Sequence, residues 1–122
     1  MLVFAVTLAG AAGALLRFAV DRMVRARLGP HFPWGTFVIN VSGSFALGLV
    51  IGAGEHHLTG PSIPVVFGIG LLGAYTTFST FAVDTTAFLQ RGEWRPALAN
   101  VGLSVTCGLG AAALGILVGG VI

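Results

Sequence analysis

A cluster of hydroxyl side chains lies in the middle of a long apolar stretch of the sequence. Four hydroxyls fall within five residues, namely those of Thr76, Thr77, Ser79 and Thr80. Such groups are costly to leave unpaired in hydrocarbon, although each can bond back to a carbonyl of its own helix. The density of the cluster, which follows Gly73, weakens helical preference and predicts a helix that is broken near the middle of a membrane. Broken helices at that depth are tolerated where they are buried or line a cavity, and they commonly form ion sites.

Two further segments carry polar or small residues every four positions, a spacing that places them on one face of a helix. The first stripe consists of Thr36, Asn40, Ser44 and Gly48, and the second of Asn100, Ser104 and Gly108. An asparagine within a membrane often only joins two helices by hydrogen bonds. Two stripes together with the hydroxyl cluster are better explained as the wall of a polar path.

The predicted path is rich in neutral hydrogen-bond donors and poor in ionised groups. Arg17 and Asp84 are the charged residues that lie deep within the apolar segments. A permanent carboxylate at mid-membrane would suit a proton or cation carrier. Amide and hydroxyl donors, together with the positive edges of phenylalanine rings, suit a small hydrated anion. They also bind weakly enough for release, which conduction requires.

Four apolar segments carry these residues and account for nearly the whole chain of 122 residues. They run from residue 2 to about 20, 34 to 54, 63 to 89 and 96 to 121, and a spanning helix needs roughly 20 residues. Only 8% of the residues are charged and the mean hydropathy is +0.97, whereas about 25% are charged in a soluble domain. We therefore predict an all-α integral membrane protein with four transmembrane helices, forming one domain over residues 1–122.

Glycine pairs at small-xxx-small spacing permit close approach between helices in lipid. Gly48 with Gly52 forms one such pair, and Gly115 with Gly119 forms another. The spacing leaves open whether these pairs join helices of one chain or of two chains.

Positive charge is confined to one side of the predicted bundle. Beyond Arg17, the basic residues lie in or beside the first and third connections: Arg22, Arg25, Arg27, Arg91 and Arg95. The side with both termini and the second connection carries no lysine or arginine. Because cytoplasmic loops carry the excess of arginine, we predict a multi-pass protein of the cytoplasmic (inner) membrane with both termini outside the cytoplasm. These arginines are explained by the orientation of the chain among membrane lipids, so their positive charge is not taken as a sign of nucleic-acid binding.

Three stretches resemble the signatures of the Fluc (also called CrcB) fluoride channels: Ala9–Phe18, Pro33–Phe45 and Gly73–Phe81. Their order and spacing agree over essentially the whole chain, and the third stretch is the most specific. Ala9 and Ala74 stand where that family usually has a glycine, from which we expect slightly looser packing. The resemblance implies a channel, not an enzyme, that exports fluoride passively and relieves fluoride toxicity. It also implies an antiparallel, dual-topology dimer.

The resemblance also assigns roles to individual residues. Those that would line the fluoride path are Phe78, Phe81, Asn40, Thr36, Ser104 and Asn100. The backbone carbonyls of Gly73 and Thr76 match those that hold a structural sodium ion at the dimer interface. Arg17 matches an arginine of the first helix, and Asp84 lies where the family often has an acidic residue near a pore end.

The arginine bias conflicts with an antiparallel homodimer, since one sequence would have to insert in both directions. Five arginines against none predict a single direction. The second subunit is therefore either the same chain or an oppositely oriented related chain, and the sequence leaves both possibilities open.

The main alternative function is a small multidrug-type, proton-coupled cation transporter, which is also four-helical. That chemistry needs a carboxylate within the membrane, typically in the first helix, where this chain has no acid. A structural membrane subunit would leave the polar stripes unexplained. The loop from Glu55 to Ser62 contains two adjacent histidines, which do not present a shared face to a metal.

Overall fold

The computed structural model describes residues 1–55 and 60–122, and within them the chain is helical almost throughout. The elements are α1 (Leu2–Leu28), α2 (Trp34–Glu55), the π-helix η1 (Pro64–Leu72), α3 (Gly73–Tyr75), α4 (Phe78–Gln90) and α5 (Trp94–Gly119). Four stretches are long and apolar enough to cross a membrane, the third being formed by η1, α3 and α4 together. This confirms the predicted set of four apolar helical spans. Residues 56–59 of the second connection, with both of its histidines, lie outside the described residues.

The first helix is longer than its apolar segment. It continues past residue 20 to Leu28, so the three arginines of this region lie on the helix itself. An ion pair of 2.9 Å between Arg25 Nε and Asp21 Oδ2, one turn apart, supports the extension. The helix stops at Gly29, whose φ of 78° is rarely adopted by other residues.

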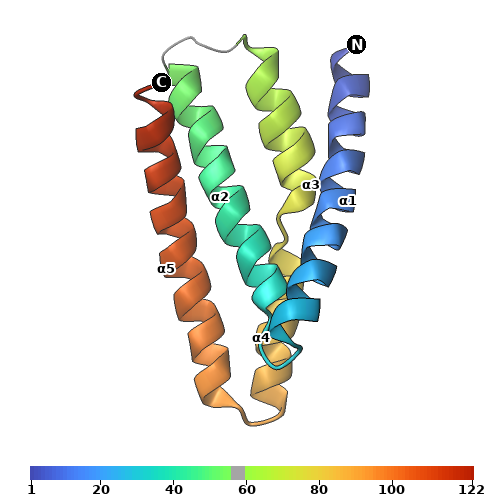
Figure 1. Ribbon diagram of the computed structural model, residues 1–122, viewed down its shortest axis with the longest axis vertical. Helices are drawn as coiled ribbons and strands as arrows, with labels where there is room; N and C mark the ends of the chain where they lie inside the picture. Colours follow the sequence, from blue (N-terminus) through green and yellow to red (C-terminus); the bar gives the residue numbers. More distant parts are fainter. Residues whose placement is uncertain (56–59) are drawn as a thin grey trace.

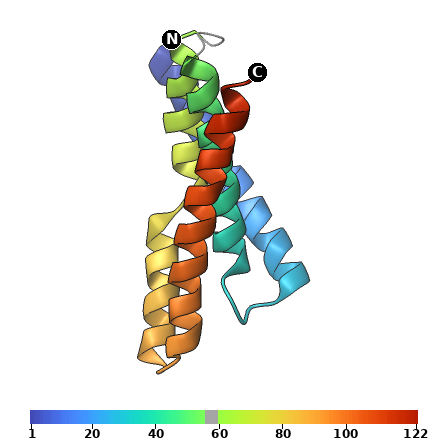
Figure 2. The ribbon, with the colours of Figure 1, turned by 90° about the vertical axis from the view of Figure 1, so that its left-hand side faces the viewer.

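The spans run up and down, so that connections alternate between the two ends of the bundle. Both termini lie at one end, and the α1–α2 and α4–α5 connections lie at the other (Figure 1). The arginines of these two connections therefore share one end, as expected for four antiparallel spans. Toward this end α1 leans away from α4 and α5, whereas α4 and α5 stay together (Figure 2).

The predicted glycine pairs pack two helices of the same chain against each other. A Cβ atom on Gly48 would clash with the Ala112 carbonyl oxygen of α5, and one on Gly115 would clash with the Phe45 carbonyl oxygen of α2. Gly52 and Gly119 make equivalent contacts one turn further along. The open question about these pairs is thus answered for this interface: they let the α2 and α5 backbones touch.

A second close contact joins α1 to η1. A Cβ atom on Gly13 would clash with the carbonyl oxygen of Leu71, and one on Gly70 would lie 3.1 Å from the methyl group of Ala9. Ala9 thus faces a glycine, which makes room for its methyl group. The apolar pattern of the sequence did not indicate that η1 has the wide turns of a π-helix, a form often found at functional sites.

A small core forms where α1, α2, η1 and α3 meet. Ile39, Leu72 and Tyr75 are its buried members. The hydroxyl group of Tyr75 lies 2.9 Å from Ser42 Oγ, which itself donates to the Val38 carbonyl oxygen. Tyr75 therefore fixes the end of α3 against α2, immediately before the hydroxyl cluster.

Candidate functional site

Two residues in extended conformation separate α3 from α4. Thr76 has φ and ψ of −74° and 159°, and Thr77 has −149° and 119°. The third span is therefore interrupted within the hydroxyl cluster, and its ribbon changes direction there (Figure 1). Thr77 is the N-cap of α4, a position that threonine favours because its side-chain oxygen can accept from an N–H of the first turn.

The hydroxyls of the cluster satisfy the backbone around the interruption and one another. Thr76 Oγ1 donates to the Leu72 carbonyl oxygen at 2.9 Å, which is the ordinary bond back to the same helix. Thr77 Oγ1 accepts from the Thr80 N–H at 3.2 Å and lies 2.9 Å from Thr80 Oγ1. Ser79 Oγ is 3.3 Å from Thr77 Oγ1. The cluster therefore starts α4 at this place.

Asn40 of α2 supplies the other partners of the interruption. Its Nδ2 donates to the Thr77 carbonyl oxygen, and its Oδ1 accepts from the Thr77 N–H, both at 2.9 Å. Sequence reasoning predicted Asn40 as a donor to an ion and missed Thr77 as its partner. No sequence signal pairs these two residues, because the bond joins a side chain to a backbone 37 positions away.

The interruption leaves the four backbone carbonyls of residues 73 to 76 without the donors of a continuous helix. The Thr77 N–H would donate to Gly73 in an unbroken helix, but it donates to Asn40. The Thr80 N–H would likewise donate to Thr76, but it donates to the Thr77 hydroxyl. Gly73 and Thr76 are the two residues whose carbonyls the family resemblance assigned to a structural sodium ion. Carbonyls of unwound membrane helices are the type of group that coordinates Na⁺.

A cavity of about 380 Å³, hereafter the main cavity, adjoins the interruption. Among the predicted site residues it is lined by Asn40, Gly73, Thr76, Phe78, Phe81 and Ser104. Ser44, the next member of the α2 stripe, lies there as well. The rings of Phe78 and Phe81 are 5.7 Å apart between centroids and inclined at 44°. The cavity thus combines hydroxyl, amide and carbonyl groups with two aromatic rings on otherwise apolar walls.

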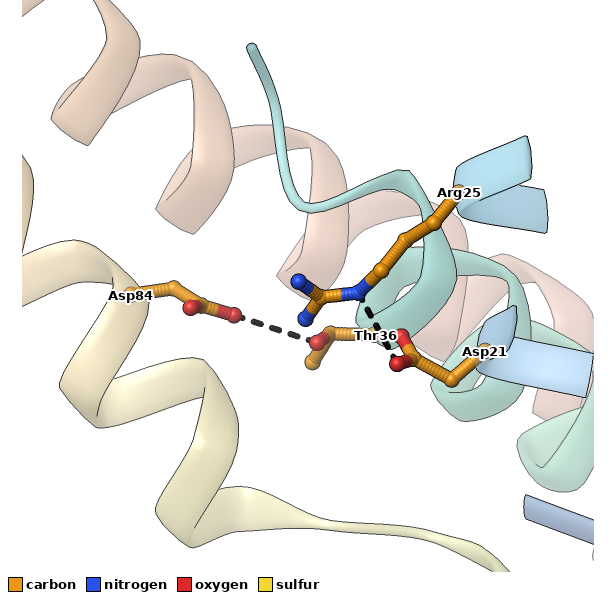
Figure 3. Close-up of polar contacts among 4 residues, drawn as sticks. All are labelled: Asp21, Arg25, Thr36 and Asp84. Atoms are coloured by element: carbon orange, nitrogen blue, oxygen red, sulfur yellow. Dashed lines mark hydrogen bonds and ion pairs between the residues drawn. The ribbon is translucent and has the colours of Figure 1, made fainter. Parts of the chain in front are cut away.

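Two residues predicted for the path do not line the main cavity. Thr36 is only 2% exposed and donates from Oγ1 to Asp84 Oδ2 at 3.1 Å (Figure 3). Asn100 is 1% exposed and donates from Nδ2 to Thr85 Oγ1 at 2.9 Å. Neither is among the residues that line the main cavity in the described part of the chain. A spacing of four residues turns about 40° around a helix at each step, so the ends of a stripe rotate away from its middle.

A smaller cavity of about 200 Å³ lies between α1, α2 and the interruption. Arg17 and Asp21 line it from α1, Thr36 lines it from α2, and Thr77 and Thr80 line it from the third span. Thr77 borders this cavity and the main cavity. Arg17, predicted as a structural or vestibule residue, therefore lines a different cavity from the two rings.

A third cavity, of about 150 Å³, opens at the arginine-bearing end. Its charged and titratable lining residues are Arg25, His31, Asp84 and Arg91. Figure 3 shows the Asp21–Arg25 ion pair beside the Thr36–Asp84 hydrogen bond. Since Thr36 borders the second cavity and Asp84 borders the third, their bond lies between the two. Polar groups thus continue from Thr77 to the arginine-bearing end.

Comparisons with known proteins agree over nearly the whole chain. The family model described as CrcB-like protein, Camphor Resistance (CrcB), matches residues 4–116. A protein of Symbiobacterium thermophilum named fluoride-specific ion channel FluC 1 is 47% identical over 114 residues, which are 91% of each chain. The protein of the same name from Streptomyces avermitilis is 46% identical over 104 residues, 85% of this chain and 84% of its own. Fluoride-specific ion channel FluC of Shewanella frigidimarina is 44% identical over 104 residues, with the same coverage.

Proposed function

This chain belongs to the CrcB family, and on that premise we propose that it is a fluoride-specific ion channel of the cytoplasmic membrane. It lets fluoride leave the cell passively and so relieves fluoride toxicity, and it is not an enzyme. The observation that carries this function is the identity of 47% over 91% of both chains with a protein named for fluoride conduction. The relatives do not favour a multidrug-type transporter.

Fluoride passes the main cavity by exchanging its water for neutral donors and ring edges. The Asn40 amide carries two N–H donors and uses one on Thr77, so the second serves the ion. The Ser104 hydroxyl adds a further donor, and the rings of Phe78 and Phe81 add their positive edges. No fixed positive charge lines this cavity among the described residues, which keeps binding weak enough for release.

A second subunit completes the path. Phe78 lines the main cavity, yet 79% of its surface is exposed in the single chain. A phenylalanine with that exposure and a cavity open beside it support closure by another subunit. The antiparallel orientation of this second subunit follows from the family resemblance. The subunit is either a second copy of this chain or an oppositely oriented related chain.

The freed carbonyls of Gly73 and Thr76 hold a structural sodium ion at the interface of the two subunits. They suit it because they are oxygen acceptors that lack their helical donors. When bound, the ion supplies a positive field near the path without standing in it. Replacing sodium by a bulky organic cation during purification should abolish conduction, and full activity in its rigorous absence would reject the site.

The arginine-bearing end faces the cytoplasm. The five arginines that lie in or beside the two connections share that end, and the termini share the other (Figure 1). Positive residues near spanning segments are retained on the cytoplasmic side. Both termini are therefore extracytoplasmic in the preferred orientation of this chain.

An efflux assay from liposomes tests the function directly. The purified chain is reconstituted with internal fluoride or internal chloride, and each anion is followed with a selective electrode. We expect fluoride efflux that far exceeds chloride efflux. Equal efflux of both anions, or of neither in the presence of any oppositely inserting partner, would reject the proposal.

A further inference from the structure

A short chain of hydrogen bonds leads from α5 to a residue of the main cavity. Asn100 Nδ2 donates to Thr85 Oγ1 at 2.9 Å, and Thr85 Oγ1 donates to the Phe81 carbonyl oxygen at 2.8 Å. Thr85 lies one turn after Phe81 on α4, and Asn100 lies one turn before Ser104 on α5. Because α4 and α5 are antiparallel neighbours, this bond crosses the helix interface one turn from the two lining residues (Figure 2).

The Asn100 side chain is not explained by stability. It is buried to 1% exposure, and its Oδ1 has no hydrogen-bond partner among the described residues. An unpaired buried carbonyl oxygen destabilises a fold, and a leucine of similar size would avoid that cost. Thr85 would keep its own bond to Phe81 without Asn100. What the amide adds is a fixed link between α4 and α5.

We propose that Asn100 is a positioning residue that sets the width, and hence the anion selectivity, of the path between Phe81 and Ser104. The inference rests on the proposed function, and it assigns Asn100 a role outside the wall of the path. Donation from the amide also polarises the Thr85 hydroxyl, which strengthens its bond to Phe81.

The packing of α5 explains why one bond has this effect. The part of α5 beyond Ser104 is fixed by the contacts of Gly115 and Gly119 with the α2 backbone. Asn100 lies on the other side of Ser104 and anchors α5 to α4 there. Without this anchor, α5 is free to move from Phe81, and a wider path admits chloride, which is larger than fluoride.

The test compares two threonines that follow each other on α4. Thr85 and Thr86 both donate to the carbonyl four residues before them, at 2.8 Å, but only the Thr85 hydroxyl also accepts a bond from α5. Asn100→Leu and Thr85→Val remove the link, Thr86→Val is the matched control, and Thr85→Ser restores the hydroxyl. The measured quantity is the ratio of fluoride to chloride efflux from liposomes.

We expect Asn100→Leu and Thr85→Val each to lower this ratio roughly three- to tenfold, the scale on which one hydrogen bond changes an equilibrium. The double variant should be no worse than either single variant, because both changes break the same link. Thr85→Ser and Thr86→Val should keep the wild-type ratio, and unfolding in detergent should show Asn100→Leu to be as stable as the wild type.

The outcomes distinguish failure of the proposed function from failure of the positioning role of Asn100. Wild-type protein that does not select fluoride rejects the proposed function itself. Selective wild type with an unchanged ratio in Asn100→Leu, or with an equal loss in Thr86→Val, overturns the positioning role. If Asn100→Leu does not fold, the Thr85→Val, Thr85→Ser and Thr86→Val ratios decide the question alone.

Discussion

The amide of Asn40 holds both backbone groups of Thr77, with two hydrogen bonds of 2.9 Å. The amide side chain thus pairs with the N–H and the carbonyl of one residue of the third span, as the backbone of a neighbouring β-strand would. The interruption is therefore satisfied although it has left the helical pattern, as buried backbone groups require. The bond to the Thr77 N–H takes the helical donor of the Gly73 carbonyl, and the bond from the Thr80 N–H to the Thr77 hydroxyl takes that of the Thr76 carbonyl.

Replacing Asn40 by aspartate should block conduction. The carboxylate keeps an acceptor for the Thr77 N–H, but it has no donor for the Thr77 carbonyl oxygen and places negative charge beside an anion path. We expect fluoride efflux to fall at least roughly tenfold, since a charge at mid-membrane costs on the order of 2.5–3.5 kcal/mol. Asn40→Ala separates the two effects, because it removes both bonds without adding charge, and it should lower the free energy of unfolding by about 1–3 kcal/mol. Wild-type efflux and stability in both variants would show that the amide is dispensable.

Loss of the aromatic rings should slow fluoride while leaving the protein folded. Phe78→Ile and Phe81→Ile roughly keep the shape of the side chain but remove the ring edge, so we expect efflux to fall about three- to tenfold in each. Phe67→Ile is the control, because Phe67 is an exposed phenylalanine of η1 that does not line the main cavity. Size-exclusion chromatography checks folding. Unchanged efflux in both cavity variants would remove the rings from the path.

The glycine contacts between α2 and α5 should be intolerant of a methyl group. Gly48→Ala and Gly115→Ala would each place a Cβ atom against a backbone carbonyl of the other helix. Overpacking of this kind costs about 1–3 kcal/mol of unfolding free energy, which denaturation in detergent can measure. Gly102→Ala and Gly110→Ala are matched controls on α5, because a Cβ built there has no heavy atom of the described residues within 4 Å outside the adjacent residues and nearby backbone of α5 itself. They should raise stability by up to about 1 kcal/mol through helix propensity.

The orientation of the chain can be read from fusions to its C-terminus. We expect a phosphatase that is active only outside the cytoplasm to be active there, and a green fluorescent protein to be dark. Replacing the five arginines at one end of the bundle by glutamine should weaken the preference for one orientation in the membrane. These are Arg22, Arg25, Arg27, Arg91 and Arg95. Equal signals from both reporters on the unaltered chain would instead show that it inserts in both directions and pairs with itself.

The sequence could predict the spans because hydrophobicity alone determines which segments enter a membrane. The family resemblance assigned Asn40, Phe78, Phe81 and Ser104 to one path, and all four line the main cavity. Spacing of four residues accounts for Asn40 and Ser104, each of which lies on a polar helix face. Their roles in conduction stay predictions. The extension of α1 to Leu28 lies outside the apolar pattern, because arginines end such a pattern without ending a helix.

Other features depend on contacts that no local pattern carries. Glycine pairs have the same four-residue spacing whether they join helices of one chain or of two chains. Only the structure could therefore place Gly48 against α5. Thr36 and Asn100 share a stripe with lining residues but meet Asp84 and Thr85 instead, because the position of α4 decides which neighbour each one finds. The Asn40–Thr77 pair likewise exists only once two distant segments are side by side.

The order in which the helices are synthesised affects the insertion of the third span, because the backbone of Thr77 is hydrogen-bonded by a side chain of α2. Asn40 leaves the ribosome 37 residues before Thr77, so its helix can already be in the bilayer when the unpaired peptide groups of Thr77 arrive. Inserted first, the same groups would meet lipid without a partner, which costs several kcal/mol for each. A permuted chain that delivered the third span ahead of α2 should therefore insert poorly, although its finished structure would contain the same contacts.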